Sequence, residues 1–534
     1  MTVTVPLDEI EAFHDVVVVG SGASGLVAAV RAAHAGHRVL VLEKAERLGG
    51  TSAAGGGVMW APDNHLMRAA GHADSAEAAA AYLRAGTEGR MPETEIDWYL
   101  RTSRAAVRYL DEHTRVAYRP LARPDYHPEW PGAATGRGLD NAAFDTATCP
   151  GLAEALRPPT YFPLLTMAER DALQGAPADP QLLADRVQSG VRTMGGALVG
   201  ALVATALERG VRIVAGAPVT SLDHAEDGWT VGVADRAVRA RQVVLASGGF
   251  EWNERLRAAY LPFPVRPISA PSNEGDGLRL GLGAGASVAD MTAVWGVPVI
   301  CAPTQVYDGV RSGRMGNVEL TLPGSLAVNA AGERFVNEAA NYHDLNRVFG
   351  TTDPRTGRRA NAPAWLVFDQ AYRDRYAVAG SPPGTVEPWM THADTLAELA
   401  ASCGIDAEQI AVTVGEFNED ARRGTDHRFG RGSSVTDRHL GDPAITPNPC
   451  LAPLDKGPYY AVPIHAGVLG TAGGLRTDGH GRVLDHEDTP LPGLYAAGNC
   501  SATVFHDAYP GGGATLGSAI TRGFAVGEHL ASVA

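Results

Sequence analysis

The sequence predicts an α/β fold, because strand and helix patterns alternate at both ends of the chain. Residues 16–19 form a short apolar run, and residues 26–35, which follow it, contain the helix-forming residues Ala, Leu and Arg. A second apolar run covers residues 38–42, so the first 43 residues contain a whole βαβ unit. The alternation returns with a strand predicted at residues 493–497 and a helix at residues 513–530.

The middle of the chain is less regular. Residues 74–113 and 197–209 have helical composition, whereas residues 119–160 are crowded with Pro, Gly and Asp. A long ordered loop of that kind is more often functional than idle. From residue 291 to 457 the βα rhythm weakens, which predicts an inserted second domain. Short strands are predicted at residues 212–215, 229–233 and 243–246.

The composition is that of a globular protein. The chain has 534 residues, of which 45% are hydrophobic and 20% charged, and this excludes disorder, collagen and coiled coil. The length suits two or three domains. Its formal net charge is −15 and no run of basic residues occurs, so nucleic acid is not an expected partner.

The cysteines and the N-terminal residues indicate in which cellular compartment the protein is expected. The 5 cysteines lie far apart without a CxxC pair, which argues against a disulfide framework and against a zinc site, so no metal is expected. Asp8, Glu9 and Glu11 lie near the N-terminus in place of a basic segment, and no apolar run approaches the roughly 20 residues of a membrane span. We therefore expect a cytoplasmic protein without an integral membrane segment.

A dinucleotide-binding motif lies between the first strand and the first helix. Gly20, Gly22 and Gly25 form a GxGxxG motif at the turn, and Glu43 ends the next strand. Glycines there permit a tight turn, close approach of the backbone to a pyrophosphate, and close packing of helix on strand. The acidic residue can hold two ribose hydroxyls, and the helix N-terminus offers amide donors to phosphates.

Later segments favour FAD over NAD as the dinucleotide. A glycine pair and two hydroxyl residues follow Glu43, and this resembles the continuation seen in FAD enzymes. Residues 246–249 resemble the second flavoprotein fingerprint, and residues 494–499 the third. The residues expected to bind FAD are Gly20, Gly22, Ala23, Ser24, Gly25, Glu43, Lys44, Gly49, Gly50, Thr51, Ser52, Gly57, Ala217, Val219, Ser247, Gly248, Gly249, Gly498, Asn499, Thr515 and Leu516.

Over nearly its whole length the sequence resembles the fumarate reductase and ketosteroid dehydrogenase group of flavoproteins. The markers are GSGASG with EKAERLGGTS, GERFVNEAAN, YYAVPIHAGVLGTAGGLRTD, and GLYAAGN with YPGGGATLG. The resemblance implies a Rossmann-like FAD-binding domain built from both chain ends, with an α+β catalytic domain inserted. We place the first part at residues 1–290, the insert at 291–457 and the second part at 458–534.

Two segments are similar to those of the 3-ketosteroid Δ1-dehydrogenase branch. They are DYHPEW at residues 125–130 and YPGGGATLG at residues 509–517. This similarity implies that Tyr126 is an active-site tyrosine, and that Tyr509 and the Gly513 N–H hold the ketone oxygen of the substrate. The histidine pair of the dicarboxylate reductases is missing before the last glycine pair of the YYAVP segment, so a dianionic substrate is not expected.

The base that removes the proton is left open by the sequence. The branch uses a second tyrosine from the inserted domain, but residues 319–322 read Glu-Leu-Thr-Leu at the corresponding place. Tyr307 and Tyr342 are the nearest alternatives, and Tyr126 acting alone is another. A free phenol has a pKa of about 10, so any such base needs a neighbouring donor or dipole.

The expected function is an FAD-dependent oxidoreductase that introduces a C=C bond next to the ketone of a 3-ketosteroid or similar bulky cyclic ketone. Its expected partners are a small apolar ketone and an external electron acceptor. One alternative is an ene-reductase of the same group acting on an enone. A second alternative is a flavin-binding protein without turnover.

Two charged pairs are interpreted as structural. His506 and Asp507 are adjacent and are expected to form a hydrogen-bonded pair. Arg334 and Glu338 lie one helical turn apart, which predicts an exposed or interdomain ion pair.

Overall fold

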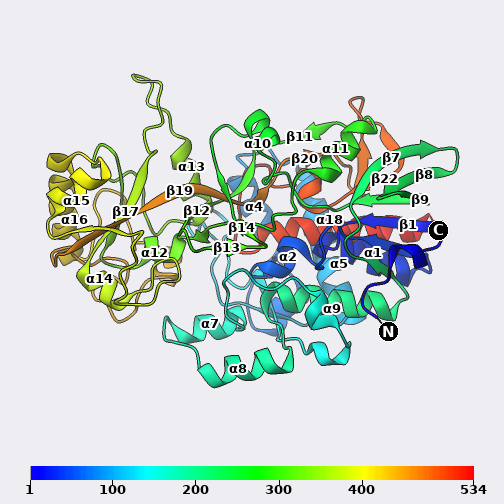
Figure 1. Ribbon diagram of the computed structural model, residues 1–534, viewed down its shortest axis with the longest axis horizontal. Coiled ribbons are helices and arrows are strands. Elements are labelled where there is room, and N and C mark those ends of the chain that lie inside the picture. The colour runs from blue at the N-terminus through cyan, green and yellow to red at the C-terminus, as the bar shows by residue number, and fades with distance from the viewer. Residues whose placement is uncertain (1, 534) are drawn as a thin grey trace. The chain divides into compact units, whose positions relative to one another are not determined.

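The computed structural model describes residues 2–533, which divide into two compact units. Unit 1 contains the residues up to Leu261, Ser269–Val294 and those from Gly470 onward, and unit 2 contains Pro262–Ile268 and Trp295–Leu469. Each unit is described by itself, with the element labels of Figure 1.

Unit 1 is built on an eight-stranded sheet with a parallel centre. The order is β21-β22-β9-β1-β2-β6, in which β22, β9, β1, β2 and β6 run parallel, while β7 and β8 extend the sheet as antiparallel strands from β9. The strands are β1 (Phe13–Val19), β2 (Val39–Leu42), β6 (Arg212–Val214), β7 (Val219–Ala225), β8 (Gly228–Val233), β9 (Arg236–Leu245), β21 (Arg482–Leu484) and β22 (Pro490–Ala496).

Both faces of this sheet are buried, as the alternating side chains of β1 show. Val16 and Val18 belong to one core cluster with the helices α1, α9 and α18, whereas Val17 and Val19 belong to another with β8 and α11. A parallel sheet that is covered on both faces reads as a continuous apolar run, which is what residues 16–19 show. The helices of unit 1 are α1 (Ala23–His34), α2 (Gly50–Ala54), α3 (His65–Ala69), α4 (Ala76–Gly86), α5 (Glu93–His113), α6 (Leu152–Ala155), α7 (Met167–Leu173), α8 (Pro180–Ser189), α9 (Met194–Glu208), α10 (Glu254–Tyr260), α11 (Asp276–Gly283) and α18 (Ala514–Ser532).

Unit 2 has a mixed sheet of its own with the order β15-β12-β19-β17-β16, and β10 and β18 also pair with β19. Leu326 and Val367 of this sheet pack against Phe417 of the long helix α16. The strands are β10 (Arg266–Pro267), β12 (Val294–Ile300), β13 (Val306–Tyr307), β14 (Val310–Arg311), β15 (Arg314–Met315), β16 (Ser325–Asn329), β17 (Ala364–Asp369), β18 (Thr391–Ala393) and β19 (Tyr459–Thr471). The helices are α12 (Asn317–Thr321), α13 (Tyr342–Arg347), α14 (Gln370–Arg375), α15 (Leu396–Cys403), α16 (Ala407–Arg423) and α17 (Val435–His439).

The α/β prediction is confirmed, and one segment is more structured than expected. The predicted first strand, helix and second strand are β1, α1 and β2, and the predicted C-terminal strand and helix are β22 and α18. Residues 119–160 were predicted as a loop, but they contain β5 (Gly138–Asn141) and α6. β5 pairs with β3 (Met59–Trp60) and β4 (Tyr118–Pro120), and such pairing between distant segments leaves little local signal. A further strand pair joins β11 (Val288–Ala289) to β20 (Gly474–Leu475).

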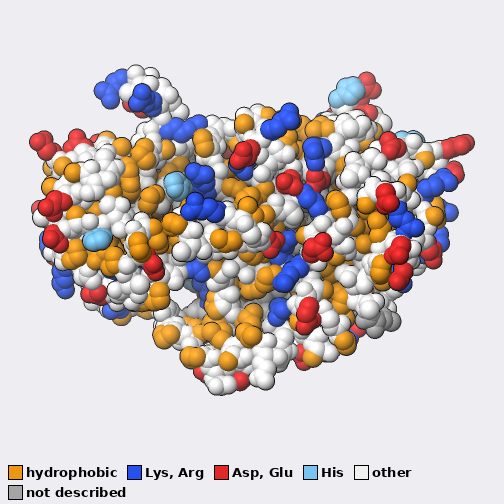
Figure 2. All heavy atoms as spheres, in the orientation of Figure 1, with side chains coloured by type: hydrophobic (Ala, Val, Ile, Leu, Met, Phe, Trp, Pro, Cys, Tyr) orange, Lys and Arg blue, Asp and Glu red, His pale blue; other side chains and the backbone are white. Residues whose placement is uncertain are grey.

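No helix among residues 2–533 is long and apolar enough to cross a membrane. Acidic and basic side chains are interspersed on the face of the molecule shown in Figure 2.

Candidate active site

The three predicted fingerprints meet in unit 1 at the carboxyl ends of β1, β9 and β22. Gly20 has φ +109°, and a Cβ added there would lie 2.4 Å from the Ala246 carbonyl oxygen at the end of β9. The Ala497 N–H donates to the Leu245 carbonyl at 3.0 Å, which joins the ends of β22 and β9. Carboxyl ends of parallel strands are where open α/β sheets bind ligands.

The first helix turn is shaped for a ligand. α1 begins after Gly22, which has no side chain to cap the helix N–H groups. The Ser52 hydroxyl accepts the Ala23 N–H at 3.1 Å, so the predicted hydroxyl residue lies at this helix start. The glycine cradle, the helix N-terminus and the acidic residue beyond β2 together fit the pyrophosphate and ribose of a dinucleotide.

Glu43 holds the glycine turn in place. One carboxylate oxygen accepts the N–H and the hydroxyl of Ser21 at 3.0 and 2.6 Å, and the other accepts the Ala45 N–H at 2.9 Å. The Ser21 hydroxyl in turn accepts the Gly49 N–H at 2.8 Å, which links the glycine pair to the turn. Lys44 points elsewhere: its ammonium forms ion pairs with Asp276 at 2.8 Å and with Glu274.

A buried carboxylate that the sequence analysis missed lies behind the second fingerprint. Glu251 is fully buried, and it accepts hydrogen bonds from the Ser269 hydroxyl at 2.6 Å and the Asn273 amide at 2.8 Å. The same Asn273 amide donates to the Thr51 hydroxyl at 3.0 Å. Burial raises the pKa of the Glu251 carboxyl. Its only sequence signal is its place two residues after Gly249.

Several of the other predicted FAD residues lie at the same strand ends. The Ala217 N–H donates to the Glu43 carbonyl at 2.8 Å, and the Ser247 hydroxyl accepts the Gly277 N–H at 2.9 Å. A Cβ at Gly498 would lie 2.5 Å from the Ser24 hydroxyl, so the third fingerprint touches the start of α1. Gly57 instead packs against the start of α9, Val219 begins β7, Asn499 follows β22, and Leu516 packs on the core beside α1.

The two tyrosines predicted for the substrate side stack on each other in unit 1. The ring centroids of Tyr126 and Tyr509 are 5.5 Å apart with an interplanar angle of 28°. A Cβ at Gly512 would lie 3.5 Å from the Tyr126 hydroxyl, and the Thr515 hydroxyl donates to the Tyr509 hydroxyl at 3.3 Å. Both phenol oxygens therefore lie at the N-terminus of α18.

Gly513 is the residue before α18, and its backbone N–H is not used as a donor within the described residues. Because Gly513 is the N-cap of α18, its N–H lies at the positive end of the helix dipole. Its φ is +98°, and a Cβ there would lie 2.6 Å from the Val58 carbonyl oxygen. Its carbonyl accepts N–H groups from Trp60 and Gly517 at 3.1 and 2.8 Å. Its own N–H donates to no acceptor among the described residues. Together with the two phenols, this N–H forms a candidate oxyanion site.

A buried charge cluster holds the Tyr126 loop. The Arg137 guanidinium donates to Asp125 at 2.7 Å and to Asp74 at 2.6 and 2.9 Å, and all three side chains are buried. The Trp60 indole donates to the other oxygen of Asp125 at 2.8 Å. These bonds anchor Asp125, so that the next residue, Tyr126, is presented toward Tyr509.

Tyr307 and Tyr342, the two alternatives for the base, both belong to unit 2. Tyr307 is buried at the end of β13, and Tyr342 begins α13 and packs against Val297 and Val299.

One prediction about a charged pair was wrong, and a second was confirmed for the pairing but wrong about its exposure. His506 forms its hydrogen bond with Asp290 at 3.0 Å, while Asp507 forms an ion pair with Arg90. Residues 504–507 form a turn in which His506 has φ +56°, and the two neighbouring side chains reach different partners, which explains why the pair does not form. Arg334 and Glu338 do form an ion pair, at 2.6 Å, but it is buried, and Asp426 joins it at 2.9 Å.

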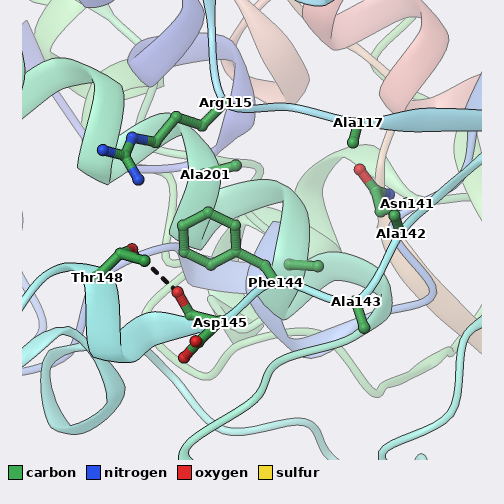
Figure 3. Close-up of a pocket in the computed structure, with 10 residues that line it drawn as sticks. Arg115, Ala117, Asn141, Ala142, Ala143, Phe144, Asp145, Thr148 and Ala201 are labelled. Atoms are coloured by element: carbon green, nitrogen blue, oxygen red, sulfur yellow. Dashed lines mark hydrogen bonds between the residues drawn. The ribbon is translucent and has the colours of Figure 1, made fainter.

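A separate cavity of about 160 Å³ opens beside α9 (Figure 3). Asn141, Phe144 and Ala201 line it, and Arg115 lies at one side. Its lining contains none of the predicted site residues.

The fold and the glycine cradle define a dinucleotide-binding flavoprotein with a separate second unit. The family model described as the FAD binding domain matches residues 15–516, so the chain belongs to that family, and FAD is its cofactor. The protein is an FAD-dependent oxidoreductase.

Three known proteins show how close the relation is. The chain is 39% identical to the 4-oxocyclohexanecarboxylate 2-dehydrogenase of Sinomonas cyclohexanicum, over 98% of this chain and 93% of that protein. It is 36% identical to the 3-oxosteroid 1-dehydrogenase of Mycolicibacterium smegmatis, over 98% of both. Among solved structures, the 3-ketosteroid Δ1-dehydrogenase of Sterolibacterium denitrificans, in complex with 1,4-androstadiene-3,17-dione, has a TM-score of 0.91 at 35% identity, covering 98% of this chain and 100% of that one. The resemblance stated from sequence is thereby confirmed.

Proposed function

We propose that the protein desaturates a bulky cyclic ketone, forming a C=C bond between the carbon next to the carbonyl and its neighbour. The observation that carries this proposal is the cluster of the Tyr509 hydroxyl, the Tyr126 hydroxyl and the unused Gly513 N–H at the N-terminus of α18. The names of the relatives support it, since they are dehydrogenases of 3-oxosteroids and of 4-oxocyclohexanecarboxylate.

In this mechanism the ketone oxygen binds between the Tyr509 O–H and the Gly513 N–H. These two donors stabilise the negative charge that develops on oxygen as the adjacent carbon loses its proton. The positive end of the α18 dipole adds to this stabilisation. Bound FAD supplies the two-electron oxidant that takes the hydride from the neighbouring carbon.

Tyr126 belongs to the proton-handling set. Its hydroxyl lies beside the Gly512 backbone, next to the proposed carbonyl site. The proton leaves the carbon either to Tyr126 or to a second tyrosine, Tyr307 or Tyr342. The electrons then pass from the reduced protein to an external acceptor.

Anaerobic mixing of the purified holoenzyme with a ketone tests the proposal. We use a 4-en-3-one steroid and 4-oxocyclohexanecarboxylate, and we follow the oxidised flavin band and the product by mass spectrometry. Bleaching with a product two hydrogens lighter is expected. If both ketones leave the flavin oxidised, while the chemically reduced enzyme is reoxidised by an enone, the proposal is wrong and the enzyme is an ene-reductase.

A further inference from the structure

One arginine of unit 1, Arg170, has no carboxylate partner within residues 2–533, although the arginines near it do. α7 carries Glu169, Arg170 and Asp171 in succession. Glu169 forms two hydrogen bonds of 2.7 Å with Arg186 of the adjacent helix α8 (Figure 1), and Asp171 forms two bonds of 2.7 and 2.5 Å with Arg123. Both acids of the helix are therefore already paired with a guanidinium.

Arg170 lies against an aromatic ring instead. Its guanidinium carbon is 5.4 Å from the centroid of the Phe162 ring. Among residues 2–533 its side chain makes neither a hydrogen bond nor a salt bridge. Burial, and next the charge of Arg123, lower the pKa of the Arg170 guanidinium. A guanidinium that is partly withdrawn from water and lies near a second one binds an anion favourably.

A continuous set of contacts leads from Arg170 to the proposed carbonyl site. Phe162 packs on a small apolar cluster that contains Val58 and Met167. Val58 is the residue that Gly513 touches, since a Cβ at Gly513 would lie 2.8 Å from a Val58 methyl group. The Phe162 ring, which lies against Arg170, thus packs on the same apolar cluster that Gly513 touches through Val58.

We propose that Arg170 binds a carboxylate carried by the cyclic ketone substrate. This inference rests on the proposed function and narrows its substrate class to keto acids. The Arg170 guanidinium binds the carboxylate through parallel N–H donors, and the apolar layer contacts the ring of the substrate. Asp171 cannot take this place, because both its oxygens are bound to Arg123. A single arginine suits a substrate with one carboxylate. The sequence also lacks the histidine pair of the dicarboxylate reductases, which argues against a substrate with two.

The test compares a charged ketone with a neutral one of the same shape. We measure kcat and KM for 4-oxocyclohexanecarboxylate and for 4-oxocyclohexanecarboxamide, with wild type, Arg170→Gln and Arg170→Lys. Arg170→Gln is expected to raise KM for the acid roughly 10- to 100-fold and to leave KM for the amide within about threefold. Arg170→Lys is expected to recover part of the loss, because it keeps the charge but not the planar donors.

The matched control is Arg186→Gln, which removes an arginine whose charge is already paired on the neighbouring helix. Its ratio of KM values for acid and amide is expected to equal that of the wild type. Calorimetric Kd values for the acid give a readout without turnover, and flavin content and thermal melting confirm that each variant is folded.

Failure of the carboxylate site and failure of the proposed desaturase activity give different results. The carboxylate site is wrong if wild type has the same kcat/KM for the amide and the acid, or if Arg170→Gln raises KM for both by the same factor. The proposed desaturase activity stands in either case. If wild type oxidises neither ketone nor the steroid, the proposed function is wrong. The carboxylate site is then decided by whether Arg170→Gln raises the calorimetric Kd of the acid.

Discussion

Two groups of polar side chains in unit 1 differ in whether their hydrogen-bonding capacity is used up. In the closed group, Arg137 lies between Asp74 and Asp125, and all three are buried. In the open group, the Gly513 N–H has no acceptor and Arg170 has no carboxylate among the described residues. Both arginines lie over aromatic rings: the guanidinium carbon is 5.4 Å from the Tyr82 centroid in Arg137 and 5.4 Å from the Phe162 centroid in Arg170. The presence of an acid, and not of a ring, distinguishes them.

The difference shows which polar groups build the structure and which are left for a ligand. A closed cluster stabilises the fold only as a set, because removing one charge leaves the others buried without a partner. An open donor contributes little to stability and gains its partner when substrate binds. Substitutions in the closed group should therefore affect unfolding, and those in the open group should affect turnover or binding.

The largest expected effect is on stability, in Arg137→Met. Two buried carboxylates lose their counter-charge, so the free energy of unfolding should fall by about 3–5 kcal/mol. Urea unfolding of the FAD-saturated protein measures it. Arg170→Met is the matched control and should change the unfolding free energy by less than about 1 kcal/mol. Equal losses in the two variants would remove the distinction between closed and open groups.

The next effect is on catalysis, in Tyr509→Phe. Loss of one oxyanion donor should lower the rate of flavin reduction by about 10²- to 10³-fold, with stability nearly unchanged. Stopped-flow absorbance measures this rate. Tyr99→Phe makes the same chemical change in a buried tyrosine whose hydroxyl donates to the Trp60 carbonyl at 2.8 Å. That control should lose about 1 kcal/mol of stability and keep most of the rate. An unchanged rate in Tyr509→Phe would contradict the carbonyl assignment.

A smaller effect is expected on binding, in Phe162→Leu. The ring under Arg170 is lost, and a cation–π contact is worth about 0.5–1 kcal/mol, so KM for the keto acid should rise about two- to fivefold. Steady-state kinetics with 4-oxocyclohexanecarboxylate measures this. Phe162→Tyr keeps the ring and should keep KM. A rise of the same size with the neutral amide would assign Phe162 to ring packing alone.

The smallest effect is on pH dependence, in Asp290→Asn. The hydrogen bond to Asp290 raises the pKa of His506 above its usual value of 6.5. A raised pKa in the folded state means that the pair stabilises the protein below about pH 6.5 and that this contribution is lost as the pH rises through the raised value. The variant should therefore unfold more easily than wild type at pH 5.5, by less than about 1 kcal/mol, and equally at pH 9. Urea unfolding at the two pH values tests this, and a difference that grows with pH would contradict it.

Local patterns were enough for the dinucleotide-binding half of the fold. The apolar run before Gly20 and the acidic end of the second strand predicted β1, α1 and β2, because a strand buried on both faces and a helix opening on glycine leave strong local signals. β5 lay inside a predicted loop, because it forms a sheet with β4 and with β3, and β3 comes from a distant part of the chain. The domain boundaries, the roles of the site residues and the identity of the base stay predictions.

The sequence by itself determined the class of cofactor and singled out Tyr126 and Tyr509 as candidates, because their motifs consist of neighbouring residues with special backbone or chemical requirements. Only the tertiary structure decided which charges are paired. His506 turned out to pair with Asp290 and not with its neighbour, and Arg334 lies buried with two acids. In the part of the chain that the structure describes, Arg170 has no acid beside it that forms a salt bridge. Electrostatic pairing depends on distances through space, and folding brings together residues separated by hundreds of positions in the chain.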